Sequence, residues 1–170
     1  MKETERKHIL ESWLNQHKTL LFKVVRTYAF NAADQDDLFQ EIVIQVWRSI
    51  PNFKGKSALT TWLYRISLNT ALAWTRKERK HQNGRQSLDH VEHILQENTK
   101  TRNERLDWLF EKIAQLNEID RSLMLLLLDG FSYRDMSGIL GISESNVGVK
   151  INRIKKRLIS EKSKIHGNGI

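Results

Sequence analysis

Four residues near the C-terminus have the side chains and the spacing needed to contact a nucleic acid. They follow one another at intervals of four, three and four positions, and they are Asn146, Lys150, Arg153 and Arg157. At 3.6 residues per turn, this spacing places all four on one face of a helix. Cations on such a face neutralise phosphates, and amide or cationic groups hydrogen bond to base edges in the major groove. We therefore predict a nucleic-acid-reading helix that begins near Glu144.

The opposite face of the same segment is apolar. Its stripe consists of Val147, Ile151, Ile154 and Leu158. A helix with one apolar and one cationic face packs against its own domain on the first and leaves the second for a partner. Many basic amphipathic helices are plain solvated surfaces, so the stripe alone does not establish a DNA-binding role.

The residues before this helix have the order of a helix-turn-helix motif. Ser132 can cap a first helix, whose apolar face is Met136, Ile139 and Leu140. Gly141 can adopt the left-handed turn conformation that strains other residues. Ile142 can fill the space between the two helices, and Ser143 can cap the second one. This combination is specific, and it predicts a recognition helix for the DNA major groove.

The N-terminal half has a predicted helix that is acidic at its start. Its apolar residues recur every four positions and have apolar neighbours; they are Leu38, Ile42 and Val46, with Phe39, Val43 and Trp47. Carboxylates at the start complement the positive end of the helix dipole, and they are Asp34, Asp36 and Asp37. Pro51 ends this helix.

A basic loop and a second amphipathic helix follow. The loop, residues 53–57, contains Lys54 and Lys56, and the helix beyond it continues the basic character with Arg65, Arg76, Lys77, Arg79 and Lys80. Trp62 has the chemistry to stack on a base, but its spacing from Leu59 and Ile66 assigns it to the core. The charge therefore changes from acidic to basic within this half of the chain.

Composition narrows the class of protein. The 170 residues include 28 Lys+Arg and 20 Asp+Glu, a net charge of +8 that favours a polyanionic partner. Disulfides, thiolate zinc sites and cysteine nucleophiles are excluded because the chain has no cysteine. The longest apolar run, residues 123–128, is too short to span a membrane, and no secretory signal is apparent at the start. We expect a cytoplasmic protein.

One proline and eight glycines leave room for long helices, and strand-like alternation is nearly missing. Two apolar-periodic blocks, at about 9–74 and 106–158, flank a polar segment. The predicted fold class is all-α, with two small helical domains joined by a polar linker. We place the first domain at 1–80, the linker at 81–104 and the second domain at 105–165.

Three segments together resemble the sigma-70 family of RNA polymerase sigma factors. DDLFQEIVIQVW at 36–47 is similar to its polymerase-binding helix, and FKG at 53–55 with TWLYRISLNTA at 61–71 resembles its promoter-melting and −10-reading segment. FSYRDM and ILGISESNV, within 116–158, resemble its −35-reading domain. The match covers nearly the whole chain in family order. With regions 2 and 4 alone, it has the pattern of the extracytoplasmic function (ECF, group 4) type.

The resemblance implies a set of contacts for each segment. Docking on the polymerase core, through its β′ and β subunits, is implied for Asp37, Leu38, Gln40, Glu41, Val46 and Trp47. Contact with the −10 element is implied for Lys54, Lys56, Arg65, Asn69 and Arg76. Contact with the −35 element is implied for Ser143, Glu144, Ser145, Asn146, Lys150 and Arg153, and the stripe adds Arg157. Leu38, Val46 and Trp47 can equally be core residues.

At one point the chain departs from the family pattern. The common Thr-Val-Lys-Ser-Arg is replaced by Asn-Val-Gly-Val-Lys at 146–150. Gly148 costs about 1 kcal/mol of helix propensity relative to alanine, which a close approach to a phosphate or to the preceding helix would explain. Lys150 lacks the planar fork of arginine, so we expect a different −35 preference.

A promoter-directing sigma factor is thus the predicted function, with polymerase core, promoter DNA and an anti-sigma factor as partners. We expect no catalytic residue, cofactor, metal or small-molecule substrate. One alternative is a stand-alone helix-turn-helix regulator, which would leave the acidic helix unexplained. A second is an enzyme with a metal on His90 and His93, although no third ligand lies nearby. A third is a basic membrane-surface protein, but the motif already uses its apolar face.

Overall fold

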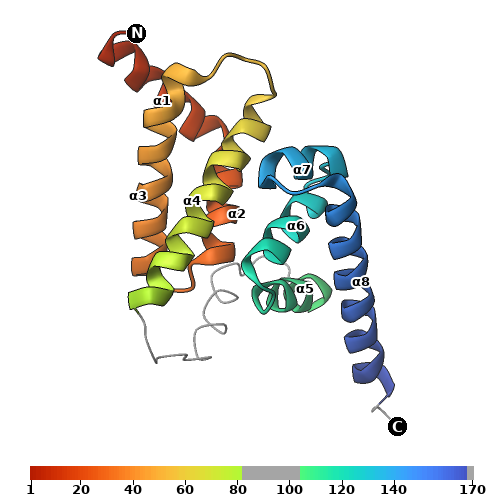
Figure 1. The fold of residues 1–170 in the computed structure, drawn as a ribbon. Coiled ribbons are helices and arrows are strands. Elements are labelled where there is room, and N and C mark those ends of the chain that lie inside the picture. Colours follow the sequence, from red (N-terminus) through yellow and green to blue (C-terminus); the bar gives the residue numbers. More distant parts are fainter. Residues whose placement is uncertain (82–103, 168–170) are drawn as a thin grey trace. The chain divides into compact units, whose positions relative to one another are not determined.

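The computed structural model describes residues 1–81 and 104–167. The chain folds as two compact units, Met1–Asp107 and Trp108–Ile170. Every regular element in the described residues is a helix (Figure 1), which confirms the all-α prediction. The predicted linker lies outside the described residues, except for His81 at the end of one helix and Glu104 at the start of the next. In chain order the helices are α1 (Glu3–Gln16), α2 (Lys18–Tyr28), α3 (Ala32–Ser49), the 3-10 turn η1 (Ile50–Asn52), α4 (Leu59–His81), α5 (Glu104–Ala114), α6 (Glu118–Leu128), α7 (Tyr133–Leu140) and α8 (Glu144–Gly167).

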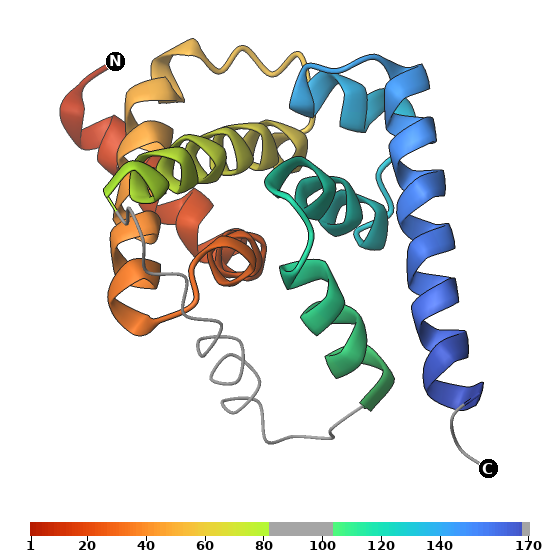
Figure 2. The ribbon, with the colours of Figure 1, turned by 60° about the horizontal axis from the view of Figure 1, so that its bottom comes forward.

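The N-terminal unit is built around the packing of α2, α3 and α4. Figure 2 shows α4 crossing α3. The apolar stripe predicted on α3 forms the centre of this core, because Leu38, Ile42 and Val46 are all 0% exposed. Leu21 and Val24 of α2 and Leu68 of α4 are buried with them. Burial of this much apolar side-chain surface, rather than helix propensity, holds the unit together.

Helix α3 begins at a reciprocal cap that the sequence analysis did not identify. The Asn31 side-chain oxygen accepts a hydrogen bond from the Asp34 backbone N–H at 2.9 Å, and the Asn31 amide donates to the Asp34 carboxylate at 2.7 Å. This satisfies one of the free N–H groups at the start of the helix. Asp34 therefore helps to start α3 through a specific hydrogen bond as well as through its charge.

Helix α1 has no buried residue and is held to α3 by Arg6. The Arg6 guanidinium lies 4.2 Å from the centre of the Trp47 ring and donates through Nε to the Trp47 backbone carbonyl at 2.8 Å. That carbonyl lies in the last turn of α3, where the helix dipole is negative. One side chain thus supplies both a cation–π contact and a helix C-terminal cap.

The C-terminal unit contains the predicted helix-turn-helix. The Ser132 hydroxyl accepts from the Asp135 N–H at 3.1 Å at the start of α7, and the Ser143 hydroxyl accepts from the Asn146 N–H at 3.1 Å at the start of α8. Between the two helices Gly141 has a φ of 69°, as its turn role requires. Ser137 adds a hydrogen bond of 2.6 Å to the Ile142 carbonyl, which ties α7 to the turn.

The apolar stripe of α8 is buried against the rest of this unit. Val147 and Ile151 are 0% exposed, while Ile154 and Leu158 pack with α5 and α6 around Met124. The predicted two-faced character of α8 is therefore confirmed, with Asn146, Arg153 and Arg157 exposed on the side away from the apolar stripe.

We predict that Arg6→Ala lowers the free energy of unfolding of the N-terminal unit by about 1–2 kcal/mol, because it removes the cation–π contact and the cap. Denaturant titration followed by tryptophan fluorescence measures this, since four of the five tryptophans precede residue 81. Lys7→Ala, at an exposed neighbour on α1, is the control and should change stability by less than about 0.5 kcal/mol. Equal effects of the two substitutions would show that Arg6 has no special role.

Candidate nucleic-acid interfaces and partner-binding helix

The start of α8 presents four polar side chains to the outside. Ser143, Glu144, Ser145 and Asn146 are all exposed, as predicted for the DNA-contacting end of a recognition helix. In helix-turn-helix proteins the first turns of the second helix reach the base edges. The capping bond of Ser143 leaves its hydroxyl at the helix start, beside the free N–H groups that can bind a phosphate.

One residue of this face was missed from the sequence. Val149 is 62% exposed and lies three residues after Asn146 and four before Arg153, on the same side of α8. A single exposed apolar residue on a helix is ordinary, and Ile159 of the same helix is 66% exposed, but an apolar side chain beside Asn146 and Arg153 has the chemistry to contact the methyl of a thymine. The signal in the sequence was its spacing from Asn146 and Arg153, because Val149 is not part of the apolar stripe.

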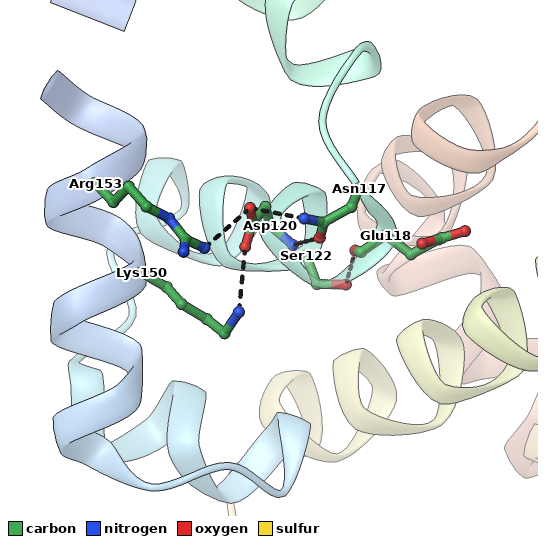
Figure 3. Close-up of polar contacts among 6 residues, drawn as sticks. All are labelled: Asn117, Glu118, Asp120, Ser122, Lys150 and Arg153. Atoms are coloured by element: carbon green, nitrogen blue, oxygen red, sulfur yellow. Dashed lines mark hydrogen bonds and ion pairs between the residues drawn. The ribbon is translucent and has the colours of Figure 1, made fainter. Parts of the chain in front are cut away.

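The cations of α8 differ in how freely they face solvent. Arg153 is 65% exposed and Arg157 58% exposed at the side chain, whereas Lys150 is only 24% exposed. Lys150 and Arg153 both extend from α8 toward Asp120 of α6, with nitrogen–oxygen distances of 3.9 Å (Figure 3). The structure therefore places Lys150 against its own unit, not at the outermost part of the predicted stripe.

Arg157 is engaged by a neighbouring carboxylate. Its Nε donates to Glu161 at 3.0 Å, and Lys112 of α5 lies 3.2 Å from the other oxygen of the same carboxylate. These bonds, first to Arg157 and then to Lys112, lower the pKa of Glu161 below its ordinary value. A carboxylate whose pKa is lowered by folding stabilises the folded unit at pH values above its ordinary pKa. That contribution is lost as the pH falls through the lowered pKa. Arg157 is thus a partly neutralised cation.

Gly148 is not required by packing within the unit. A β-carbon at this position would meet the Tyr133 ring of α7 at 3.5 Å, which is ordinary van der Waals contact. Gly148 does lie near the preceding helix, as the sequence suggested, but the space there also accommodates an alanine.

In the N-terminal unit, three aromatic rings fix the basic loop. Phe53 packs against Trp62 with ring centres 4.9 Å apart, and Trp13 of α1 lies 5.3 Å from Phe53 and 5.4 Å from Trp62. Trp62 is half-buried in this cluster, which agrees with its assignment to the core. Beyond Phe53, Lys54 and Lys56 are exposed on either side of Gly55, whose φ is 66°.

The predicted −10 residues of α4 share one exposed face. Arg65, Asn69 and Arg76 are all exposed, and their spacing of four and seven residues aligns them along the helix. An open groove of about 420 Å³ runs beside this face between α3 and α4. Its lining includes Asn69 and Lys77 of α4 and Glu41 of α3, so it joins two of the predicted contact regions.

Helix α3 exposes only part of the predicted polymerase-binding set. Asp37 and Gln40 are exposed and Glu41 is half-buried. Leu38 and Val46 are 0% exposed, which favours the alternative that they are core residues, and a direct docking role for them stays a prediction.

Two further side chains define this surface of α3. Trp47 is half-buried beneath Arg6, and Ile44, which the sequence analysis did not single out, is 41% exposed. The Asp37 carboxylate also accepts a hydrogen bond of 2.7 Å from the Trp74 indole, so one predicted docking residue ties α3 to α4.

Within 1–81 and 104–167, no cluster of three or more metal-ligating side chains is found, and no helix is long and apolar enough to cross a membrane. The His90 and His93 pair considered as a metal site lies outside these residues.

Comparison with known families matches two regions. Residues 13–81 match Sigma-70 region 2, and residues 106–158 match Sigma-70, region 4. The RNA polymerase sigma-H factor of Pseudomonas aeruginosa is 29% identical over 157 residues, 84% of this chain and 79% of that protein. The ECF RNA polymerase sigma-E factor of Haemophilus influenzae is 31% identical over 137 residues, 74% of this chain and 72% of that protein.

Two solved structures share the fold. One is the sigma factor RpoE in complex with the anti-sigma factor NepR from Bartonella quintana, with a TM-score of 0.68, 19% identity, and coverage of 87% of this chain and 92% of that one. The other is CnrH in complex with the cytosolic domain of CnrY, with a TM-score of 0.64, 19% identity, and coverage of 93% and 90%.

We predict that Gly148→Ala raises the stability of the C-terminal unit by about 1 kcal/mol, because alanine favours the helix and its β-carbon fits beside Tyr133. Thermal or denaturant unfolding measures the change. Gly141→Ala is the contrasting variant and should destabilise the same unit, since its φ of 69° strains any β-carbon. A loss of stability in Gly148→Ala would mean that the packing of α7 on α8 is tighter than these distances indicate.

Proposed function

The chain belongs to the sigma-70 family, as an ECF-type factor that directs RNA polymerase to promoters, and from this premise we propose which of its surfaces carry out each part of that task. The observation that carries the proposal is the two-faced α8, which buries Val147 and Ile151 completely while its first turn exposes four polar side chains. In this proposal α8 reads the −35 element, α4 and the basic loop hold the −10 element, and α3 binds the polymerase core.

The proposed −35 surface is the outward face of α8. Ser143, Glu144, Ser145 and Asn146 supply donors and acceptors for base edges and phosphates, and Val149 supplies an apolar contact. Arg153 is the most exposed of the three cations in the predicted stripe and is the best placed to reach a phosphate. Arg157 contributes less, because Glu161 already binds it.

The proposed −10 surface combines the loop lysines with one face of α4. Opening a duplex needs cations for the displaced strand and a place for unstacked bases. Lys54, Lys56, Arg65 and Arg76 supply the charge, and Asn69 can hydrogen bond to a base from the edge of the groove. The aromatic cluster supports this role by fixing where the loop leaves the domain, which lowers the entropy lost on binding.

The proposed polymerase-binding surface is the exposed side of α3. Asp37, Gln40, Glu41 and Ile44 follow one another at intervals of three, one and three residues and so lie together on the helix. Two carboxylates around an exposed isoleucine form a surface suited to a partner with basic and apolar side chains. Leu38 and Val46 support it from beneath, and Trp47 borders it.

We assign residues 1–80 to region 2, 81–104 to the linker and 105–165 to region 4. Because the two reading surfaces lie on separate units, engagement of one raises the local concentration of the other at the promoter when polymerase fixes their geometry. The protein itself is proposed to be non-catalytic and to act in the cytoplasm, where it meets polymerase. The two solved relatives bound to protein partners support an anti-sigma factor as a further partner.

A stand-alone helix-turn-helix regulator, the alternative considered from the sequence, does not fit the match to both sigma-70 regions. It would bind its DNA site equally well without polymerase, and it would have no use for the acidic and apolar surface of α3. Run-off transcription with purified core polymerase on a library of promoters tests the choice. We expect transcripts that depend on this protein, and an absence of such transcripts would refute the sigma-factor assignment.

We predict that the double substitution Gln40→Ala, Glu41→Ala weakens binding to core polymerase by about tenfold or more, because interface truncations of this kind each cost roughly 1 kcal/mol. Titration of core polymerase with the labelled full-length chain measures it. Glu11→Ala, at an exposed carboxylate of α1, is the matched control and should bind normally. Wild-type affinity in the double variant would remove α3 from the interface.

Leu38→Ala separates support from contact on the same helix. Since Leu38 is 0% exposed, its truncation should cost about 2–5 kcal/mol in unfolding free energy. Core binding by the fraction that stays folded should be near normal. A specific loss of binding without destabilisation would show instead that Leu38 is reached by the partner.

A further inference from the structure

Three helices in the described part of the chain start with the same kind of reciprocal cap, and one of them has an additional feature. Asn31 with Asp34 caps α3, Asn117 with Asp120 caps α6, and Ser132 with Asp135 caps α7. In each pair the first side chain accepts from the backbone N–H of the aspartate three residues later. Capping needs only a polar side chain at the surface of the helix start.

Asp120 is the member of this set that is buried. It is 6% exposed, whereas Asp34 is half-buried and Asp135 is exposed. A carboxylate removed from water is costly unless a cation or hydrogen bonds compensate it. The cap occupies only Oδ2, which accepts from the Asn117 amide at 2.9 Å. The other oxygen, Oδ1, is buried and accepts no hydrogen bond.

The compensation comes from the DNA-reading helix. The Lys150 ammonium lies 3.9 Å from Oδ1, and the Arg153 guanidinium lies 3.9 Å from Oδ2 (Figure 3). Both are long ion pairs. Lys150 is the more enclosed of the two, with 24% of its side chain exposed against 65% for Arg153. One carboxylate thus faces two cations at the same distance, and of the two Lys150 is the more enclosed.

On the premise that α8 reads the −35 element, we propose that Asp120 is a positioning residue that keeps Lys150 from the DNA backbone and so limits the salt-sensitive, sequence-independent part of the affinity of α8. The carboxylate draws the lysine stem along α6 and offsets its charge. A flexible, fully charged lysine at this position would bind any phosphate within its reach, because such contacts carry no sequence information. With Lys150 restrained, recognition rests on Asn146 and Val149, and Arg153 remains available for the backbone.

The test is a charge-neutral substitution, Asp120→Asn, in the full-length chain assembled with core polymerase. An asparagine oxygen can still accept from the Asn117 amide, so the cap is retained while the charge is lost. Binding is measured from 50 to 200 mM salt on two duplexes. One carries a −35 sequence selected by the wild-type complex from a randomised library, and the other carries a scrambled −35 sequence.

We expect Asp120→Asn to bind both duplexes more tightly at low salt and to lose the gain as salt rises. One added phosphate contact makes the logarithmic salt slope steeper by about 0.9, or about 3.5-fold in affinity over this fourfold range. Because a phosphate contact is independent of sequence, both duplexes should gain by this factor and the ratio of their affinities should stay within about twofold. A purely structural role for Asp120 would weaken binding to both duplexes and leave the salt slope unchanged, which would overturn the proposal.

Two further variants make the test specific to Lys150. In a Lys150→Gln background, Asp120→Asn should no longer change the salt slope, whereas in a Lys112→Gln background its full effect should persist. Lys112 is the matched control because it is a lysine of the same unit that pairs with Glu161 instead. An equal effect of Asp120→Asn in both backgrounds would contradict the role of Lys150.

The Lys150→Gln variant alone decides the matter even if Asp120→Asn does not fold. A restrained Lys150 contributes little to the selected sequence, so its loss should change the affinity ratio less than threefold. A larger fall would mean that Lys150 reads bases directly, and the proposal would fail. If the wild-type complex itself did not distinguish the two duplexes, the −35 role of α8 would fail instead.

Discussion

Burial of one stripe on each long helix is the constraint from which the rest of this structure follows. On α8, complete burial of Val147 and Ile151 leaves only one orientation for the helix, and that orientation carries Asn146, Val149 and Arg153 outward. On α3, burial of Leu38, Ile42 and Val46 does the same for Asp37, Gln40 and Ile44. Because the side chains of a helix share one rigid backbone, the core selects which polar residues a partner can reach.

Regions that carry exposed cations are held by local contacts of a different kind. The loop lysines Lys54 and Lys56 have no burial to place them, and the Trp13, Phe53 and Trp62 rings fix the loop at its start. Arg6 attaches α1 to the end of α3, and Trp13 of the same helix packs against Phe53 and Trp62. Aromatic ring packing and a capping cation therefore hold this surface in position, as the apolar core holds the helices elsewhere.

Nearby carboxylates reduce, to different extents, the positive charge that the cations of α8 present to a partner. Arg153 is exposed beside a long ion pair, Arg157 is hydrogen bonded to Glu161, and Lys150 is largely enclosed near Asp120. A net charge counted from the sequence gives these three cations equal weight. A protein cation adds electrostatic affinity for DNA when it can reach a phosphate and release the counterions condensed on the DNA. The effective cationic surface of α8 is therefore smaller than its composition indicates.

The sequence by itself determined the helical class, the helix-turn-helix and the polar face of α8, because periodicity, caps and a turn glycine are local properties that act within a few residues. It also indicated that Trp62 packs within its own unit, where it is half-buried against Trp13 and Phe53. What only the tertiary structure decided is which of those residues are accessible and what they touch. Of the two roles open to Leu38 and Val46, their burial favours the core; Val149 and Ile44 are exposed; and Lys150 lies 3.9 Å from Asp120, thirty positions away in the chain. Such contacts depend on how α6 and α8 pack against each other, and a local pattern contains no information on the distance between two helices.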